Sequence, residues 1–184
     1  MRIIIVFFLS VLLFSCGDSN NKDIISNEEV QKIESFVMKS QAILGKNLMR
    51  KITKSGTVAA LEFCNVNALP LLDSMSTILN VDIKRVSDQN RNNNNCANAK
   101  ELKFIIKCKE LLNLGQKIKP LIEKENNVIS AYFPILTNGM CLQCHGESEK
   151  INIATSQRLN VLYPNDKAIG YSENQLRGIW VVSY

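Results

Sequence analysis

The chain has 184 residues, with 22 lysines and arginines against 17 aspartates and glutamates and a formal net charge of +5. This length suits one domain with its own hydrophobic core. The cationic excess is small and scattered, without a basic run interleaved with aromatic residues, so we expect no nucleic-acid partner, whereas an anionic membrane surface or an acidic partner protein is compatible with the charge.

The N-terminal residues have the pattern of an export signal. Arg2 precedes an apolar run from Ile3 to Phe14, which is shorter than the roughly 20 apolar residues that a spanning helix needs. The run ends in Leu13-Phe14-Ser15-Cys16, which resembles a bacterial lipobox and implies cleavage before Cys16 and attachment of lipid to that residue. An uncleaved anchor and an ordinary signal peptide are the alternatives. We expect an exported protein that is lipid-anchored to a bacterial membrane, on its periplasmic or cell-surface side.

The sequence predicts three segments: a signal peptide at residues 1–15, an acylated cysteine with a flexible polar tether at 16–26, and one folded domain at 27–184. Ser26 and Glu29 have the spacing of a capping box, and apolar residues then keep helical spacing as far as Gly56. A long N-terminal helix is therefore expected, which either packs on the domain or extends from it.

A second helix is expected from Thr57 to Leu79, with Cys64 on its apolar face and with a kink or restart at Pro70. Beyond it we expect a strand at 81–87, an asparagine-rich surface loop at 90–98, a helix at 98–114, and strands at 127–136 and 179–184. Helices and strands are mixed without a βαβ repeat, so the predicted fold class is α+β.

The single histidine of the chain follows directly on a cysteine pair, giving Cys141-Leu142-Gln143-Cys144-His145. This is the attachment motif of a c-type haem, in which both thiols bond to the porphyrin and the imidazole is the proximal iron ligand. The sequence thus predicts one covalent haem c on Cys141 and Cys144, with His145 on the iron.

A Cys-x-x-Cys pair also occurs in structural zinc sites and in redox-active disulfides. The remaining cysteines Cys64, Cys96 and Cys108 do not form the second pair that zinc usually requires. A thioredoxin-like motif belongs at the start of a helix after a strand in a βαβ unit, and the flanking Asn138-Gly139 and Gly146 argue against that setting.

The sixth iron position has no second histidine to fill it. We favour Cys64, and the alternatives are Met38, Met49, Met75 or an open site. Met140 adjoins the attachment motif and cannot easily reach the opposite face of the haem. The alternative role for Cys64 is that of a small buried hydrophobic residue.

Export permits a disulfide between Cys96 and Cys108. A helix that begins at residue 98 would carry Cys108 about three turns from its start, beyond the roughly 7 Å between Cα atoms that a disulfide tolerates. We therefore favour two unpaired thiols, with a bridge as the alternative only if the helix begins later, and assign neither cysteine to iron.

Four cationic side chains are candidate partners for the haem propionates, because a carboxylate that leaves water needs a charge-assisted hydrogen bond. Each of them could instead be a solvated surface charge. They are Arg85, Arg91, Lys167 and Arg177. The aromatic residues Tyr132, Phe133 and Trp180 either line the pocket or belong to the core.

Several segments together resemble a known family, the PAS-like single-haem c-type domains, which occur as stand-alone exported proteins and as sensor regions of membrane histidine kinases. The segments are Ala60-Leu61-Glu62-Phe63-Cys64, Lys84-Arg85-Val86-Ser87 with Arg91-Asn92, Tyr132-Phe133-Pro134-Ile135, residues 141–146, residues 163–171 with the sequence Tyr-Pro-Asn-Asp-Lys-Ala-Ile-Gly-Tyr, and Leu176-Arg177-Gly178. The resemblance covers residues 57–184. It implies an antiparallel PAS-like sheet flanked by helices, with haem held against it and a possible thiolate ligand at the position of Cys64.

These features predict a membrane-anchored monohaem c-type protein that acts in one-electron transfer or redox sensing outside the cytoplasm, with a redox partner protein or a signalling partner. The alternative is a sensor that binds a diatomic gas such as NO or CO after Cys64 dissociates and signals through a separate partner. A peroxidase-like enzyme would want a distal acid-base residue, and the lack of a second histidine counts against it. We expect a carrier or sensor rather than a catalyst.

Overall fold

The computed structural model describes residues 25–184. Its elements are α1 (Asn27–Leu79), β1 (Asp82–Val86), the 3-10 helix η1 (Asn93–Asn95), α2 (Ala99–Asn113), β2 (Leu121–Glu125), β3 (Val128–Leu136), α3 (Gly139–His145), α4 (Ile153–Leu162) and β4 (Leu176–Ser183). The expected signal peptide and the lipidation of Cys16 lie outside the described residues. Within them, no helix combines the length and the apolar character needed to cross a membrane.

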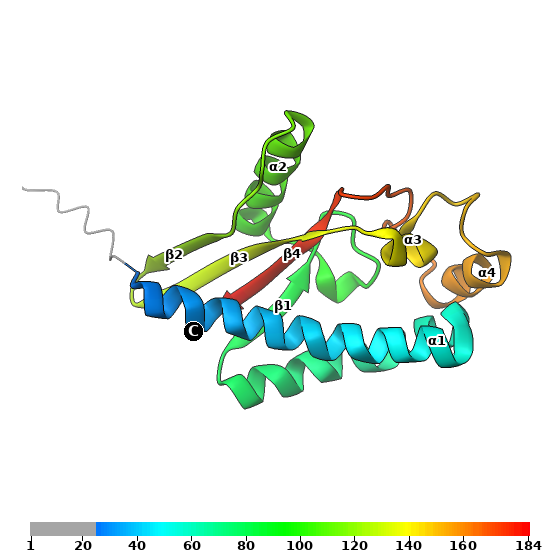
Figure 1. The fold of residues 1–184 in the computed structure, drawn as a ribbon, viewed down its shortest axis with the longest axis horizontal. Coiled ribbons are helices and arrows are strands. Elements are labelled where there is room, and N and C mark those ends of the chain that lie inside the picture. Colours follow the sequence, from blue (N-terminus) through cyan, green and yellow to red (C-terminus); the bar gives the residue numbers. More distant parts are fainter. Residues whose placement is uncertain (1–24) are drawn as a thin grey trace, which may run out of the picture.

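Helix α1 consists of two arms joined at Gly56 (Figure 1). The expected capping box is formed, because the Ser26 hydroxyl accepts from the backbone N–H of Glu29 while the Glu29 carboxylate accepts from that of Ser26. Gly56 adopts φ 79°, which a residue with a Cβ rarely adopts, and the chain reverses direction there. Both arms and their boundary agree with the sequence prediction.

Of the predicted kink or restart at Pro70, the restart is wrong. Within α1, only Gly56 departs from helical backbone angles, so the second arm continues through Pro70. The proline removes one backbone donor, and it lies with Val66 on the exposed side of the arm, where water can satisfy the carbonyl left without a partner.

The four strands form one antiparallel sheet in the order β1-β4-β3-β2. Because successive side chains of a strand point to opposite faces, β1, β3 and β4 each contribute to two cores. Phe133 lies opposite Trp180 on the face covered by α1, and Tyr132 lies opposite Val181 on the face covered by α2. The predicted α+β class with an antiparallel, PAS-like sheet flanked by helices is confirmed.

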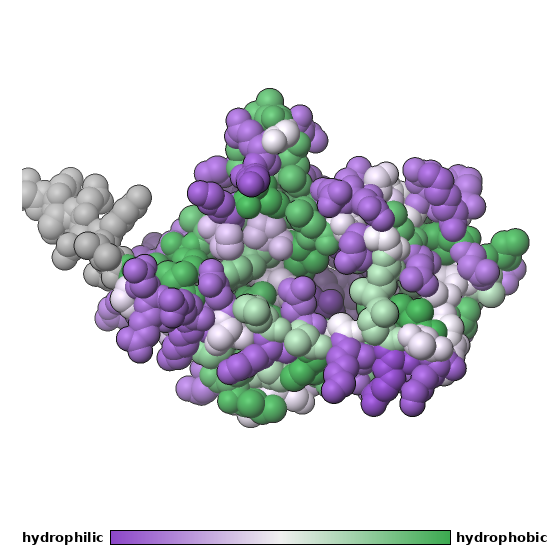
Figure 2. Space-filling view, viewed as in Figure 1, coloured by the Kyte–Doolittle hydropathy of each residue, from purple (hydrophilic) through white to green (hydrophobic). Residues whose placement is uncertain are grey.

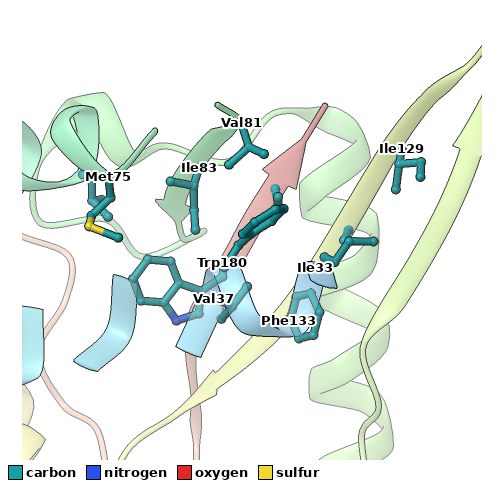
Figure 3. Packing of buried hydrophobic residues seen from close by; sticks show 12 residues of the cluster. Ile33, Val37, Met75, Val81, Ile83, Ile129, Phe133 and Trp180 are labelled. Atoms are coloured by element: carbon teal, nitrogen blue, oxygen red, sulfur yellow. The ribbon is translucent and has the colours of Figure 1, made fainter. Parts of the chain in front are cut away.

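Both arms of α1 contribute to the larger core (Figure 3). The long N-terminal helix therefore packs on the domain rather than extending from it. The core residues of α1 are Ile33, Phe36, Val37, Leu72 and Met75, and they meet Ile83, Ile129, Ala131, Phe133, Trp180 and Val182 of the sheet.

Four elements were not predicted, namely η1, β2, α3 and α4. The edge strand β2 has the sequence Leu-Ile-Glu-Lys-Glu, in which three charged residues obscure the strand pattern, and α4 buries only Thr155 and Leu159 of its ten residues. The last strand was predicted but begins at Leu176, three residues before the expected start at Ile179.

We expect Ile33→Ala to lower the free energy of unfolding by about 2–5 kcal/mol, because Ile33 is fully buried between α1 and the sheet and its truncation leaves a cavity. Ile78→Ala is the matched control in the same helix, since Ile78 is 74% exposed, and it should change stability by less than about 0.5 kcal/mol. Urea denaturation of the two variants measures the difference. Equal losses would contradict the packing of the first arm on the sheet.

Candidate functional site

An open pocket lies where the α1 face of the sheet continues beyond the core, between the two arms of α1 and the helix α3. It holds about 1250 Å³ of empty space, including its mouth. Figure 2 shows a hollow on this side of the molecule, just above the first arm of α1. The lining residues come from α1 (Leu48, Ile52, Ala60, Leu61, Cys64, Ala68, Leu69), from β1 and the loop after it (Arg85, Val86, Ser87, Asn90, Arg91, Asn92, Asn95), and from Ile135, Met140, Cys141, Cys144, His145, Tyr163, Arg177 and Gly178.

The cysteine motif forms most of the short helix α3, which directly follows β3. The Asn138 side chain accepts from the backbone N–H of Cys141 and caps this helix. The expectation that the motif does not start a helix after a strand is therefore wrong, because Asn138 is a good N-cap residue. The neighbouring strands β3 and β4 are antiparallel, so the setting is still not the βαβ unit of a thioredoxin-like site.

The imidazole of His145 is held in one orientation from behind. Its Nδ1 lies 2.6 Å from the carbonyl oxygen of Ala168, which can only accept, so Nδ1 carries the proton and Nε2 keeps a free lone pair. Two backbone bonds, from Tyr171 N–H to the His145 carbonyl and from Gly170 N–H to that of Gly146, fasten the segment after α4 to the end of α3.

Burial holds the pKa of His145 well below its usual value, and the nearby guanidinium of Arg91 lowers it further. The ring is thus a neutral imidazole, the form in which histidine binds metals.

Cys64, Cys141 and Cys144 line the same pocket as free thiols. Burial raises the pKa of Cys64, and the guanidiniums of Arg85 and Arg91 oppose that rise by favouring the thiolate. Burial also raises the pKa of Cys144. The thiols of Cys64 and Cys144 therefore stay protonated, next to positive charges that would stabilise a thiolate formed there.

The other two described cysteines lie apart from the pocket. Cys96 is exposed and Cys108 is buried in the core under α2, and both are free, as the spacing argument predicted. Among the described residues, moreover, no group of three or more acidic, histidine or cysteine side chains is arranged to hold a metal ion, so the zinc alternative gains no support.

Of the pocket-lining residues in the described chain, three are arginines and none is acidic. Arg85 lies 5.4 Å from the centre of the Trp180 ring, and Arg177 donates to the Ser87 hydroxyl and the Gln89 carbonyl. The Nε of each guanidinium is buried and has no hydrogen-bond partner in the described chain. Two half-buried, incompletely bonded cations at one pocket fit an anionic ligand.

Arg91 also lines the pocket, but its guanidinium is already paired with Asp166 at 2.9 Å. Lys167 does not line the pocket and is exposed. Among the described residues, the structure therefore brings Arg85 and Arg177 to the pocket as cations without an acidic partner, brings Arg91 there as half of an ion pair, and leaves Lys167 outside.

The methionines proposed as iron ligands are not brought to the site, since Met38 and Met49 are exposed away from the pocket lining and Met75 is buried in the core. Met140 does line the pocket, from α3 itself. The aromatic residues Tyr132, Phe133 and Trp180 lie in the two cores and are absent from the lining.

No role was predicted for Asp166 and Ala168, although both lie in the segment 163–171 that carried the family resemblance. The apolar wall residues Leu48 and Ile52 of the first arm were not predicted as part of the site either. These two were recognised only as members of an apolar helical stripe, which does not distinguish a core contact from a pocket wall.

Comparison with known proteins gives two positive results. A family model described as Tll0287-like matches residues 20–184. Among solved structures, the chain is similar to the crystal structure of the cyanobacterial haem protein Tll0287, with 15% sequence identity and a TM-score of 0.65, over 87% of this chain and 96% of that one. No curated protein matches the chain.

Gly178 lets β1 approach β4 closely at the floor of the pocket. A Cβ there would collide with the backbone carbonyl of Val86, so we expect Gly178→Ala to cost about 1–3 kcal/mol of stability. Gly45→Ala is the control, because a Cβ at this helical position meets no atom within 4 Å and should stabilise the protein by about 0.5–1 kcal/mol. Thermal denaturation of both variants tests the prediction, and a stable Gly178→Ala protein would refute the close approach.

Proposed function

We propose, from the premise that this chain belongs to the Tll0287-like family, that its pocket holds one haem c, joined covalently to Cys141 and Cys144 and bound at iron by His145. The similar solved structure is of a protein described as a haem protein, which supports haem for this pocket. The observation that carries the proposal is that one short helix presents two free thiols and one imidazole to a single pocket.

The chain's own groups fit that cofactor. The carbonyl of Ala168 fixes the Nδ1 proton of His145 and leaves Nε2 as the iron-binding nitrogen. Two propionates would bring two negative charges, and Arg85 and Arg177 supply two guanidiniums with unused donors, while Arg91 is already neutralised by Asp166. Of the four cations predicted as propionate partners, we therefore retain Arg85 and Arg177.

Cys64 is the proposed sixth ligand. It stands on the second arm of α1, on a different wall of the pocket from His145. Arg85 and Arg91 favour the deprotonated sulfur that iron binds. A thiolate at this place stabilises ferric over ferrous iron, which lowers the reduction potential and makes the ligand easier to lose on reduction.

Haem, when bound, supplies a one-electron couple, and the protein sets the potential through its ligands, hydrogen bonds and charges. We propose that the protein acts in one-electron transfer or redox sensing with a partner protein. The export signal and lipobox-like sequence at Cys16 support a location on the outer side of a bacterial membrane, held there by lipid.

Expression in a host with c-type haem maturation tests the cofactor. We expect haem that stays on the polypeptide after denaturation, because thioether bonds survive unfolding, and its loss in the double variant Cys141→Ala/Cys144→Ala. Cys96→Ala is the control, since Cys96 is an exposed thiol outside the pocket lining, and it should retain covalent haem. Mass spectrometry of the denatured chains provides the measurement. A wild-type chain without added haem mass would overturn the proposal.

Absorption and electron paramagnetic resonance spectra test the sixth ligand. The ferric protein should show thiolate ligation that is lost in Cys64→Ser, with a higher reduction potential in the variant. Cys108→Ser is the control for removing a buried thiol, because Cys108 lies in the other core, and its spectrum should match that of the wild type. An unchanged spectrum in Cys64→Ser would leave the proposed haem intact and exclude Cys64 as its sixth ligand. Binding of NO or CO that displaces the thiolate would favour the gas-sensor alternative.

A further inference from the structure

We propose that Arg91 and Asp166 are a positioning pair that sets the ligand strength of His145 and thereby the reduction potential of the iron. This inference rests on the proposed haem site, and it concerns residues that would touch neither the porphyrin vinyl groups nor the iron.

The carbonyl oxygen of Ala168 receives two hydrogen bonds. The Nδ1–H of His145 donates to it at 2.6 Å, and the Nη2 group of Arg91 donates to it at 3.3 Å. A carbonyl has two lone pairs and can serve both donors. The guanidinium nevertheless withdraws electron density from this carbonyl oxygen. The carbonyl therefore polarises the Nδ1–H bond of His145 less than it would without the hydrogen bond from Arg91. Arg91 thus limits the negative character of the imidazole.

The guanidinium of Arg91 also reaches the attachment helix. Its Nη2 donates to the backbone carbonyl of Cys144 at 2.5 Å, next to His145 in the chain. One planar group therefore links the carbonyl that orients the imidazole to the helix that carries it, and Arg91 comes from the loop after β1, far from both in sequence.

Asp166 holds the opposite side of the same network. One carboxylate oxygen accepts from Nε of Arg91 at 2.9 Å, and the other accepts from the backbone N–H of Ala168 at 2.8 Å. The carboxylate thereby fixes both the guanidinium and the peptide group whose carbonyl faces His145. Arg91, Asp166 and Ala168 form a closed set of hydrogen bonds around the Nδ1 proton.

Both side chains of the pair are only 10% exposed, so water screens their charges weakly. The nearby guanidinium acts against positive charge on His145, and the same field disfavours the more positive, ferric state of an iron bound there. Asp166 cancels part of that field. If Arg91 and Asp166 only held the 163–171 segment in place, removing their charges would not shift the reduction potential in opposite directions. This difference makes the role testable.

Redox titration of the haem-loaded protein is the central experiment. Arg91→Gln removes a positive charge and a competing donor, so it should lower the reduction potential. Asp166→Asn leaves Arg91 uncompensated, so it should raise the potential. Arg91→Lys keeps the charge but cannot reproduce the planar set of bonds, and it should fall between Arg91→Gln and the wild type. The control is Lys100→Gln, which breaks an ion pair with Glu123 between α2 and β2 and should leave the potential unchanged.

A second measurement does not need haem. His145 is the single histidine of the chain, so its ring nitrogens are unambiguous in ¹⁵N nuclear magnetic resonance of the haem-free protein. Arg91→Gln should move the Nδ1 resonance, because the Ala168 carbonyl, to which Nδ1–H donates, becomes a stronger acceptor. Lys100→Gln should leave the resonance in place.

Potential shifts of the same sign in Arg91→Gln and Asp166→Asn, or shifts no larger than that of Lys100→Gln, would overturn the inference. If either charge-removing variant does not fold, a potential of Arg91→Lys equal to that of the wild type would overturn it as well. A wild-type chain that acquires no covalent haem would instead refute the proposed function. The Nδ1 resonance of Arg91→Gln would then decide the positioning role by itself: a shift would support the role, and an unchanged resonance would overturn it.

Discussion

The packing of α1 on one face of the sheet is the constraint on which the rest of the structure depends. Burying side chains such as Ile33, Phe133 and Trp180 contributes about 1.5–3 kcal/mol each, which is enough to fix the first arm on the strands. The helix is longer than this contact, and Gly56 returns the chain as a second arm. The two arms extend past the core, and the space between them, the end of the sheet and α3 becomes the pocket.

The residues of the sheet change in character where the core under α1 ends and the pocket begins. Trp180 closes the core, and its cross-strand neighbour Arg85 turns its guanidinium over the indole ring toward the pocket. Beside them Gly178 contributes no side chain, so the floor stays open. Burial lowers the pKa of Arg85, because a charge away from water is unfavourable without an anionic partner. An anionic cofactor such as the proposed haem would relieve this cost, so the same residues that end the core prepare the site.

Much of the site was predictable because its central part is contiguous in sequence. The Cys-x-x-Cys-His motif needs no tertiary contact to be recognised, and α3 simply displays it. The choice among the cations was not predictable, because the state of each depends on residues far away in the chain. Arg91 is neutralised by Asp166, 75 positions later, whereas Lys167, next to that aspartate, faces solvent. A sequence pattern does not contain such distances.

The sequence by itself determined the two arms of α1 and their break at Gly56, the α2 helix, the strands β1, β3 and β4, and the α+β class. These elements have strong local signals: capping residues, apolar periodicity and a glycine at positive φ. It missed η1, β2, α3 and α4. Of these, β2 and α4 are held in place by β3 and by α1 rather than by their own patterns. Only the tertiary structure decided that Cys64 shares a pocket with His145 and that Ala168 orients the imidazole, because these contacts join segments whose distance along the chain hides their proximity in space.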